Sequence, residues 1–314
     1  MKWAVAAIVL TFTTGCGRYA DFALPAPEAA GPKAPFTWTA TPAPVLTRGE
    51  VSDVLNPSVV RFHDVYWNLY SEYDQKAWHT AVATSAEGVS WTKIARVLSP
   101  DRGGDIAANG SALVAGDQIL YWYETGHPLR IALARSGDGR TWTKDPPEAL
   151  PLGPYGSFDE KAVADPYVIR AGEYFYMYYL GQDRAARQRL GVARSHDGVT
   201  WEKLRANPVL QLEENIGEPA VWTSGGAWWM LYTVRARDEQ RRIELARSPD
   251  GVAWQRVPDF SIAGTEPWNS KVVCDPSVEQ MPDGSIRVWF GGGDVASPDQ
   301  ELHGQIGLGV LRSR

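Results

Sequence analysis

The sequence is poor in several features that would mark other classes of protein. It has only two cysteines in 314 residues, Cys16 and Cys274, so we expect no intrachain disulfide and a buried, small hydrophobic role for Cys274. The formal net charge is −6 without a basic stripe, which gives no electrostatic case for binding nucleic acid. No segment sustains a 3.6-residue apolar period, so we expect almost no helix.

The N-terminus lacks a hydrophobic run long enough to span a bilayer. A lysine at position 2 precedes a short apolar run over residues 4–12, which is typical of a signal peptide. The ending Gly15-Cys16 resembles a bacterial lipoprotein signal, with Thr13 in place of the usual leucine. We therefore predict a signal peptide over residues 1–16, lipidation of Cys16 and a cell-envelope lipoprotein on the periplasmic or surface face. An ordinary secretory signal with an incidental cysteine is the alternative.

One phrase ending in tryptophan is present four times. The copies are Ser85–Trp91, Ser136–Trp142, Ser195–Trp201 and Ser248–Trp254. The closing tryptophans are 51, 59 and 53 residues apart, and a period of about fifty residues indicates a repeat architecture. Asp-Gly, or Glu-Gly in the first copy, predicts a tight turn between two strands.

A second element follows each tryptophan by about 17–23 residues. It is a polar residue, usually followed by proline, that opens a short apolar strand. The five such positions, called slot residues below, are Asn56, Asn109, Asp165, Glu218 and Asp275. Trp38 precedes Asn56 by 18 residues, and Trp91 precedes Asn109 by the same number, so Trp38 supplies a fifth copy.

These repeats predict an all-β fold, a five-bladed β-propeller over residues 36–314. The segment near Trp38 is expected to close the last blade, and radial repetition leaves only short sheet edges. Residues 17–35 are rich in Ala, Pro and Gly, which predicts a flexible tether. A monomer is expected, because no interface segment is evident.

In a propeller the innermost strands line the central channel, so the slot residues should converge on one funnel. Three of them are acids, and neighbouring carboxylates in a partly dry cleft can supply both an acid and a base. Hydrolysis of a glycosidic bond needs such a pair. For one position the simpler interpretation is a turn cap, since Asx-Pro opens many strands, but five positions in register favour a shared site.

On these residues the sequence resembles the five-bladed propeller glycoside hydrolases, the superfamily of family 43 arabinanases and xylosidases and family 32 fructosidases. The resemblance covers residues 36–312. It rests on the Asp-Gly-x-x-Trp repeats, on Asp165-Pro166 following Phe158-Asp159-Glu160, and on Gly217-Glu218-Pro219. It implies that Glu218 is the general acid and that Asp165 orients this acid and tunes its pKa.

The resemblance also implies a general base in blade one, where this sequence has Asn56, and an amide cannot take a proton from water. Three explanations stay open. Asp53, three residues upstream, or Asp275, across the axis, serves as the base. Alternatively, inorganic phosphate attacks the sugar, as in the family 130 phosphorylases, which the sequence resembles in its Asn-Pro. In the third, catalysis is lost and the protein only binds glycan.

A phosphate site needs cations. Lys161 and Lys271 each lie four residues before a slot acid, a spacing that can place both on one face of a strand. A surface or structural ion pair is the simpler role for each lysine.

The leading hypothesis is hydrolysis of a furanoside or short oligosaccharide, with Asn56 and Asn109 bound to sugar hydroxyls. Trp268 and His127 are candidate sugar contacts at the rim. No cofactor is expected. Some relatives hold an axial Ca²⁺ near a histidine, which makes His303 a candidate ligand, although a lone histidine more often has a structural role.

Overall fold

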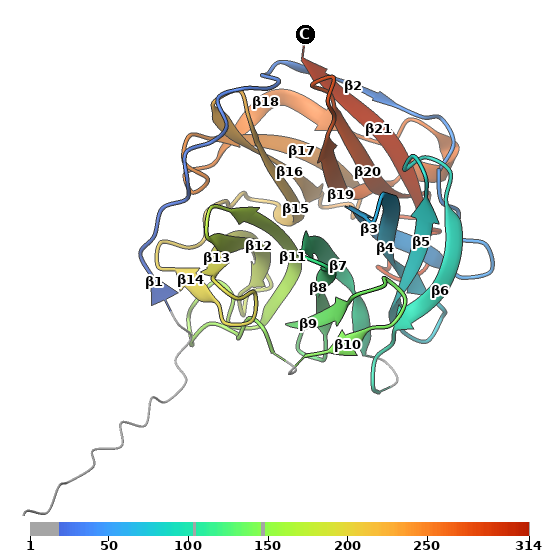
Figure 1. The fold of residues 1–314 in the computed structure, drawn as a ribbon, viewed down its shortest axis with the longest axis horizontal. Coiled ribbons are helices and arrows are strands. Elements are labelled where there is room, and N and C mark those ends of the chain that lie inside the picture. The colour runs from blue at the N-terminus through green and yellow to red at the C-terminus, as the bar shows by residue number, and fades with distance from the viewer. Residues whose placement is uncertain (1–18, 103–104, 146–147, 314) are drawn as a thin grey trace, which may run out of the picture.

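The computed structural model describes residues 19–102, 105–145 and 148–313. The predicted signal peptide and Cys16 lie outside the described residues, so the lipid anchor stays a prediction. Figure 1 shows strands arranged around a central axis. The described part of the protein has one helical element, the 3-10 helix Pro267–Asn269, and contains no helix long and apolar enough to cross a membrane.

Antiparallel pairing groups twenty of the described strands into five units of four, here called blades; short parallel pairs also join blade one to blade two and blade four to blade five. Blade one is β3 (Asp53–Phe62), β4 (Val65–Tyr73), β5 (Trp78–Ser85) and β6 (Thr92–Leu98). Blade two is β7 (Ile106–Ala115), β8 (Gln118–Thr125), β9 (Arg130–Ser136) and β10 (Thr143–Lys144). Blade three is β11 (Ala162–Ala171), β12 (Tyr174–Gln182), β13 (Gln188–Ser195) and β14 (Glu202–Leu204). Blade four is β15 (Asn215–Ser224), β16 (Ala227–Arg235), β17 (Arg241–Ser248) and β18 (Gln255–Ile262). Blade five is β19 (Val272–Gln280), β20 (Ile286–Gly293), β21 (Gln305–Ser313) and β2 (Phe36–Ala40).

This architecture confirms the predicted all-β propeller class. Within each blade the order is slot strand, aromatic strand, third strand and outer strand, as the repeats predict. The outer strand of blade five is β2, which pairs antiparallel with β21 and places Trp38 opposite Leu311. The N-terminal and C-terminal segments of the propeller therefore close the ring together.

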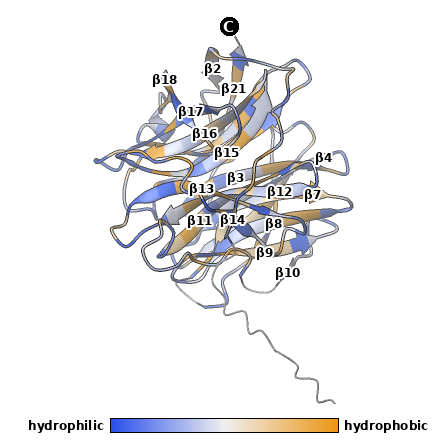
Figure 2. Ribbon diagram, turned by 90° about the vertical axis from the view of Figure 1, so that its left-hand side faces the viewer, coloured by the Kyte–Doolittle hydropathy of each residue, from blue (hydrophilic) through white to orange (hydrophobic). Residues whose placement is uncertain are grey.

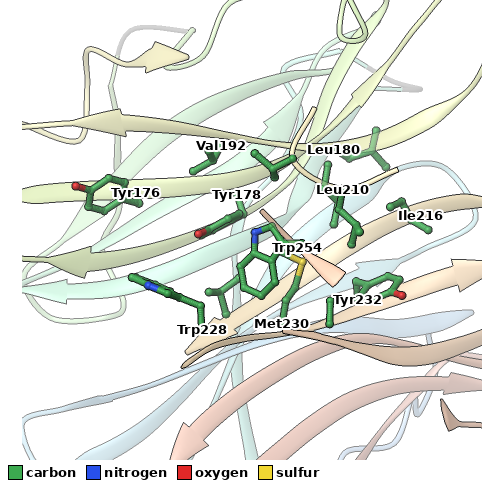
Figure 3. Packing of buried hydrophobic residues seen from close by; sticks show 14 of the residues in the cluster. Tyr176, Tyr178, Leu180, Val192, Leu210, Ile216, Trp228, Met230, Tyr232 and Trp254 are labelled. Carbon is green, nitrogen blue, oxygen red and sulfur yellow. The ribbon is translucent and has the colours of Figure 1, made fainter. Parts of the chain in front are cut away.

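The second strand of each blade is buried on both faces, which explains its aromatic sequence. Alternate residues of a strand point to opposite faces. In β12, Tyr176 and Tyr178 face the apolar side chains of β16, and Trp254 lies between the two strands (Figure 3). The other face of β12, including Tyr179, packs toward blade two with Trp122. Figure 2, a side view coloured by hydropathy, shows hydrophobic and hydrophilic residues along the same strands.

The repeated turn phrase is the contact between blades. The glycine of each turn has a positive φ, between 73° and 77°, and lies against an aromatic ring of the preceding blade. A Cβ on Gly139 would approach Trp67 to 2.4 Å, and one on Gly198 would approach Trp122 to 2.9 Å. Glycine is therefore required both by conformation and by space. The indole of Trp122 also donates to the carbonyl of Gly198 at 2.8 Å.

The N-terminal segment corrects one prediction. Residues 19–35 are not a free tether, because β1 (Tyr19–Ala20) pairs parallel with β14 and Leu24 is 8% exposed within the core between blades three and four. Further along, the amide of Gly225 donates to the carbonyl of Ala30 at 2.7 Å. The segment is thus a strap that runs from blade three across blade four to β2.

This strap should contribute to stability. Leu24→Ala should lower the free energy of unfolding by about 2–3 kcal/mol, because it removes a buried leucine side chain. Urea unfolding followed by tryptophan fluorescence measures this change. The matched control is Glu28→Ala, an exposed strap position, which should have little effect. Equal stability of Leu24→Ala and the wild type would show that the strap is only loosely bound.

Candidate active site

The five slot residues share an unusual backbone conformation. Each lies at a register shift in the first strand of its blade. Each also has a positive φ, from 46° at Asp165 to 53° at Asp275. A non-glycine residue in this region is uncommon and costs on the order of 1–3 kcal/mol. The β-bulge re-aims the side chain, as bulges near functional sites do.

Hydrogen bonds join the slot residues of neighbouring blades. The carboxylate of Asp165 accepts from the backbone amide of Glu218 at 3.0 Å, and Glu218 in turn accepts from the amide of Asp275 at 3.0 Å. Asp275 accepts from the amide of Asn56 at 3.2 Å, which carries the pattern from the last blade to the first. The amide of Asn109 donates instead to the hydroxyl of Ser71 at 2.8 Å. The structure therefore brings the five predicted residues together.

All five slot residues line one pocket of about 500 Å³ on the axis. Such a volume is ordinary for a small-molecule site. Side chains from the adjacent strand ends complete its wall, including Tyr73, Trp78, Glu124 and Arg241.

Glu124, at the end of β8, is a site residue that the repeat pattern did not reveal. Its Oε1 accepts from Asn109 Nδ2 at 2.6 Å and from the backbone amide of Asp165 at 2.7 Å. The same Asn109 nitrogen donates to Asp165 at 2.8 Å. Both of its hydrogens are thus bonded to carboxylates, so this nitrogen is not free to bind a sugar hydroxyl as expected from the sequence. Burial, followed by the charge of Asp165, raises the pKa of Glu124 well above its usual range.

Two further carboxyl groups meet beside Cys274. An oxygen of Glu218, an oxygen of Asp275 and the sulfur of Cys274 lie within 4.8 Å of one another. The thiol of Cys274 donates to Asp275 Oδ2 at 2.9 Å, while Oδ1 of Asp275 is buried without a hydrogen-bond partner in the described structure. Burial, followed by the charge of Glu218, raises the pKa of Asp275 well above its usual range. Cys274 is buried, as the sequence predicts.

The cations of the pocket are not the predicted ones. Lys161 and Lys271 are exposed and do not line the pocket; Lys76, Arg235 and Arg241 line it instead. Spacing along a strand failed as a guide because both lysines lie before the first residue of the slot strand.

Asp53 is also placed away from the pocket. It is fully buried, and its two oxygens accept from the backbone amides of Glu301 and Gly304 at 2.6 and 2.7 Å. Its carboxylate fastens β3 to the loop before β21. This placement contradicts the hypothesis that Asp53 is the base.

The aromatic side of the pocket differs from expectation as well. Trp268 stacks on Phe290 at a centroid distance of 6.0 Å, donates to the carbonyl of Pro42 at 2.8 Å and does not line the pocket. Tyr73 and Trp78 line it instead, with ring centroids 5.2 Å apart. These two aromatic residues occur at the strand ends of blade one and are not part of the repeated pattern, so the repeats did not predict them.

Of the two candidate histidines, His127 lines the pocket, whereas His303 does not. His303 is half exposed and contacts Asp294 at 2.7 Å. The cluster of Glu218, Asp275 and Cys274 does not fit Ca²⁺, because that ion takes six to eight oxygen ligands and this cluster offers a thiol.

A family model described as "Glycosyl hydrolases family 32 N-terminal domain" matches residues 59–270, more than half of the sequence. The protein belongs to this family. An uncharacterized protein of Mycobacterium tuberculosis is 28% identical in an alignment of 230 positions, and the match covers 64% of the present protein and 75% of the mycobacterial one.

Solved structures support the same fold. Zg3597, a family 117 glycoside hydrolase of the marine bacterium Zobellia galactanivorans, aligns with a TM-score of 0.64 and 15% identity over 91% of each protein. The Bombyx mori GH32 beta-fructofuranosidase BmSUC1 aligns with a TM-score of 0.64 and 17% identity over 86% of the present protein and 62% of its own length. The resemblance to propeller glycoside hydrolases is thus confirmed, as is the expectation of a glycosidase with a carbohydrate substrate.

The pKa of Asp165 leads to a prediction for stability. Burial, followed by the charge of Glu218, raises it to about 6 from 3.8, so the folded protein binds this proton more tightly than the unfolded state does. The free energy of unfolding should therefore fall as pH rises from about 4 to about 6. Asp165→Asn should lessen that fall, measured by urea unfolding across this range.

The control for this prediction is Asp64→Asn, whose side chain is 95% exposed. It should keep the wild-type pH dependence. If Asp165→Asn also keeps it, the carboxyl of Asp165 does not titrate in this window.

Proposed function

We propose that the protein hydrolyses a furanoside in the axial pocket, with Glu218 as the general acid and Asp275 as the second carboxylate. The observation that carries the proposal is that both groups line the pocket and that an oxygen of one lies within 4.8 Å of an oxygen of the other. The similarity to a beta-fructofuranosidase supports a furanoside as substrate.

The reaction follows from this geometry. The pair shares one proton, which Glu218 gives to the glycosidic oxygen as the bond to the anomeric carbon breaks, while the ionised carboxylate of Asp275 bonds to that carbon. Glu218 then takes a proton from water, whose oxygen displaces Asp275 and releases the sugar. An oxygen of each group lies within 4.8 Å of the other, which is below the ~6.5–9.5 Å gap of inverting enzymes, so the proposal is a retaining mechanism.

The surrounding residues have supporting roles. Asp165 holds the backbone of Glu218 through the hydrogen bond described above. Tyr73 and Trp78 offer apolar rings on which the C–H face of a sugar can pack. Asn56 cannot act as a base, and its amide group is available to a sugar hydroxyl at the pocket wall.

Variants of the two carboxylates test the assignment. Glu218→Ala should lower kcat/KM by about 10²–10⁴ on unactivated glycosides and less on nitrophenyl glycosides, whose leaving group needs no acid. Asp275→Ala should be impaired on both. Azide should then yield a glycosyl azide of inverted configuration with Asp275→Ala and of retained configuration with Glu218→Ala, identified by NMR.

Lys161→Ala, exposed and outside the pocket, is the control and should behave as the wild type does. The substrates to be tested with each variant are fructofuranosides, arabinofuranosides, xylosides and mannosides. Full activity of the Glu218 variant on every substrate would refute its role. If the wild type hydrolyses none of these substrates, the result would favour a protein that binds glycan without cleaving it.

A second candidate is a phosphorylase on the same scaffold, favoured by Asn56 in the blade-one slot together with Lys76, Arg235 and Arg241 on the pocket wall. A phosphate oxygen would attack the anomeric carbon as the glycosidic bond breaks and Glu218 protonates the departing oxygen, which yields a sugar phosphate and a free hydroxyl. This function predicts that turnover requires phosphate and that Lys76→Ala raises the KM for phosphate. Undiminished cleavage in phosphate-free buffer, measured as reducing sugar, would exclude it.

A further inference from the structure

Glu124 occupies a position that has an equivalent in every blade. It lies on the second strand of blade two, opposite Ala108, which is the last paired residue before the bulge shifts the register. The equivalent second-strand residues are Ser71, Leu180, Thr233 and Gly291. Blade two alone has a carboxyl group there, and this group contacts the acids of the axis.

Among the described residues, Glu124 accepts two hydrogen bonds, and both come from residues of the site. Asn109 and the backbone of Asp165 both donate to Oε1, which leaves Oε2 as the position for a proton. The two carboxyl groups lie beside each other, because the same Asn109 nitrogen donates to Glu124 at 2.6 Å and to Asp165 at 2.8 Å. Glu218 and the phenol of Tyr121 are further titratable groups that act on Glu124.

Two carboxyl groups this close together, one buried and one partly buried, are not both ionised at neutral pH, so the pair retains a proton. Asp165 accepts one hydrogen bond from Asn109 and another from the amide of Glu218, and such donors favour its ionised form. Glu124 is 3% exposed and is the less solvated partner. The proton therefore belongs on Glu124.

We propose that Glu124 is a positioning residue that carries the proton of this pair and donates it in a hydrogen bond to Asp165. The bond holds the Asp165 carboxylate against the backbone of Glu218. Since Asp165 contacts Glu218, this inference rests on the proposed function for its effect on turnover. The protonation of Glu124 does not depend on that function.

Kinetics of two variants test the positioning role. Glu124→Gln keeps a donor and an acceptor, so its kcat/KM should stay within about threefold of the wild type and its pH profile should not move. Glu124→Ala removes the donor to a charged group, so kcat/KM should fall about 10- to 100-fold. Its acidic limb should move to higher pH, because the hydrogen bond that favours ionised Asp165 is lost. Equal losses in both variants, or wild-type kinetics in Glu124→Ala, would overturn the proposal.

Infrared spectroscopy tests the proton without reference to activity. The carbonyl band of a protonated carboxyl group should be present in the wild type at neutral pH and weakened in Glu124→Gln. The matched control is Glu244→Gln: Glu244 is fully buried but paired with Arg242 and Arg256 outside the pocket. This control should keep the band. A band that is unchanged in Glu124→Gln would refute a protonated Glu124 whether or not the protein is a hydrolase.

Discussion

The positive φ of the slot residues is the constraint on which the axial site depends. A regular strand would alternate its side chains between two faces, and a bulge at the same place in every blade turns one polar side chain toward the axis instead. The strained conformation is stabilised by hydrogen bonds from the next blade, as between Asp165 and the amide of Glu218. The same groups that hold the ring together are thereby gathered as a site.

Closure of the ring determines which residues become neighbours. Asn56 and Asp275 are 219 positions apart in sequence, yet the amide of one donates to the carboxylate of the other. Trp289 of blade five donates to the carbonyl of Gly88 in blade one, at 2.8 Å, so the turn contact that joins consecutive blades also joins the last to the first. The site therefore requires a completed propeller.

Crowding of acids gives the pocket its chemistry. Glu124, Asp165 and Asp275 all have raised pKa values because burial and neighbouring charge disfavour ionisation. Identical functional groups then differ in protonation, which is the condition for acid and base roles in one cleft. Arg241 lies against the same cluster and, with Arg235, binds Asp299 of the loop before β21.

The repeats were sufficient to predict the propeller, the closing role of Trp38 and the convergence of the slot residues, because a periodic sequence must form equivalent structures in each copy. Predictions that relied on nearness in sequence were less successful. Asp53 is three residues from Asn56, but its carboxylate binds backbone amides of the loop before β21 instead of facing the pocket. Glu124 and Trp78 are departures of single blades from the repeat, and a repeat pattern gives no signal for these. The sequence by itself determined the architecture and the ring of polar residues. Only the tertiary structure decided which further side chains reach the axis and where their protons lie, because both depend on contacts between blades.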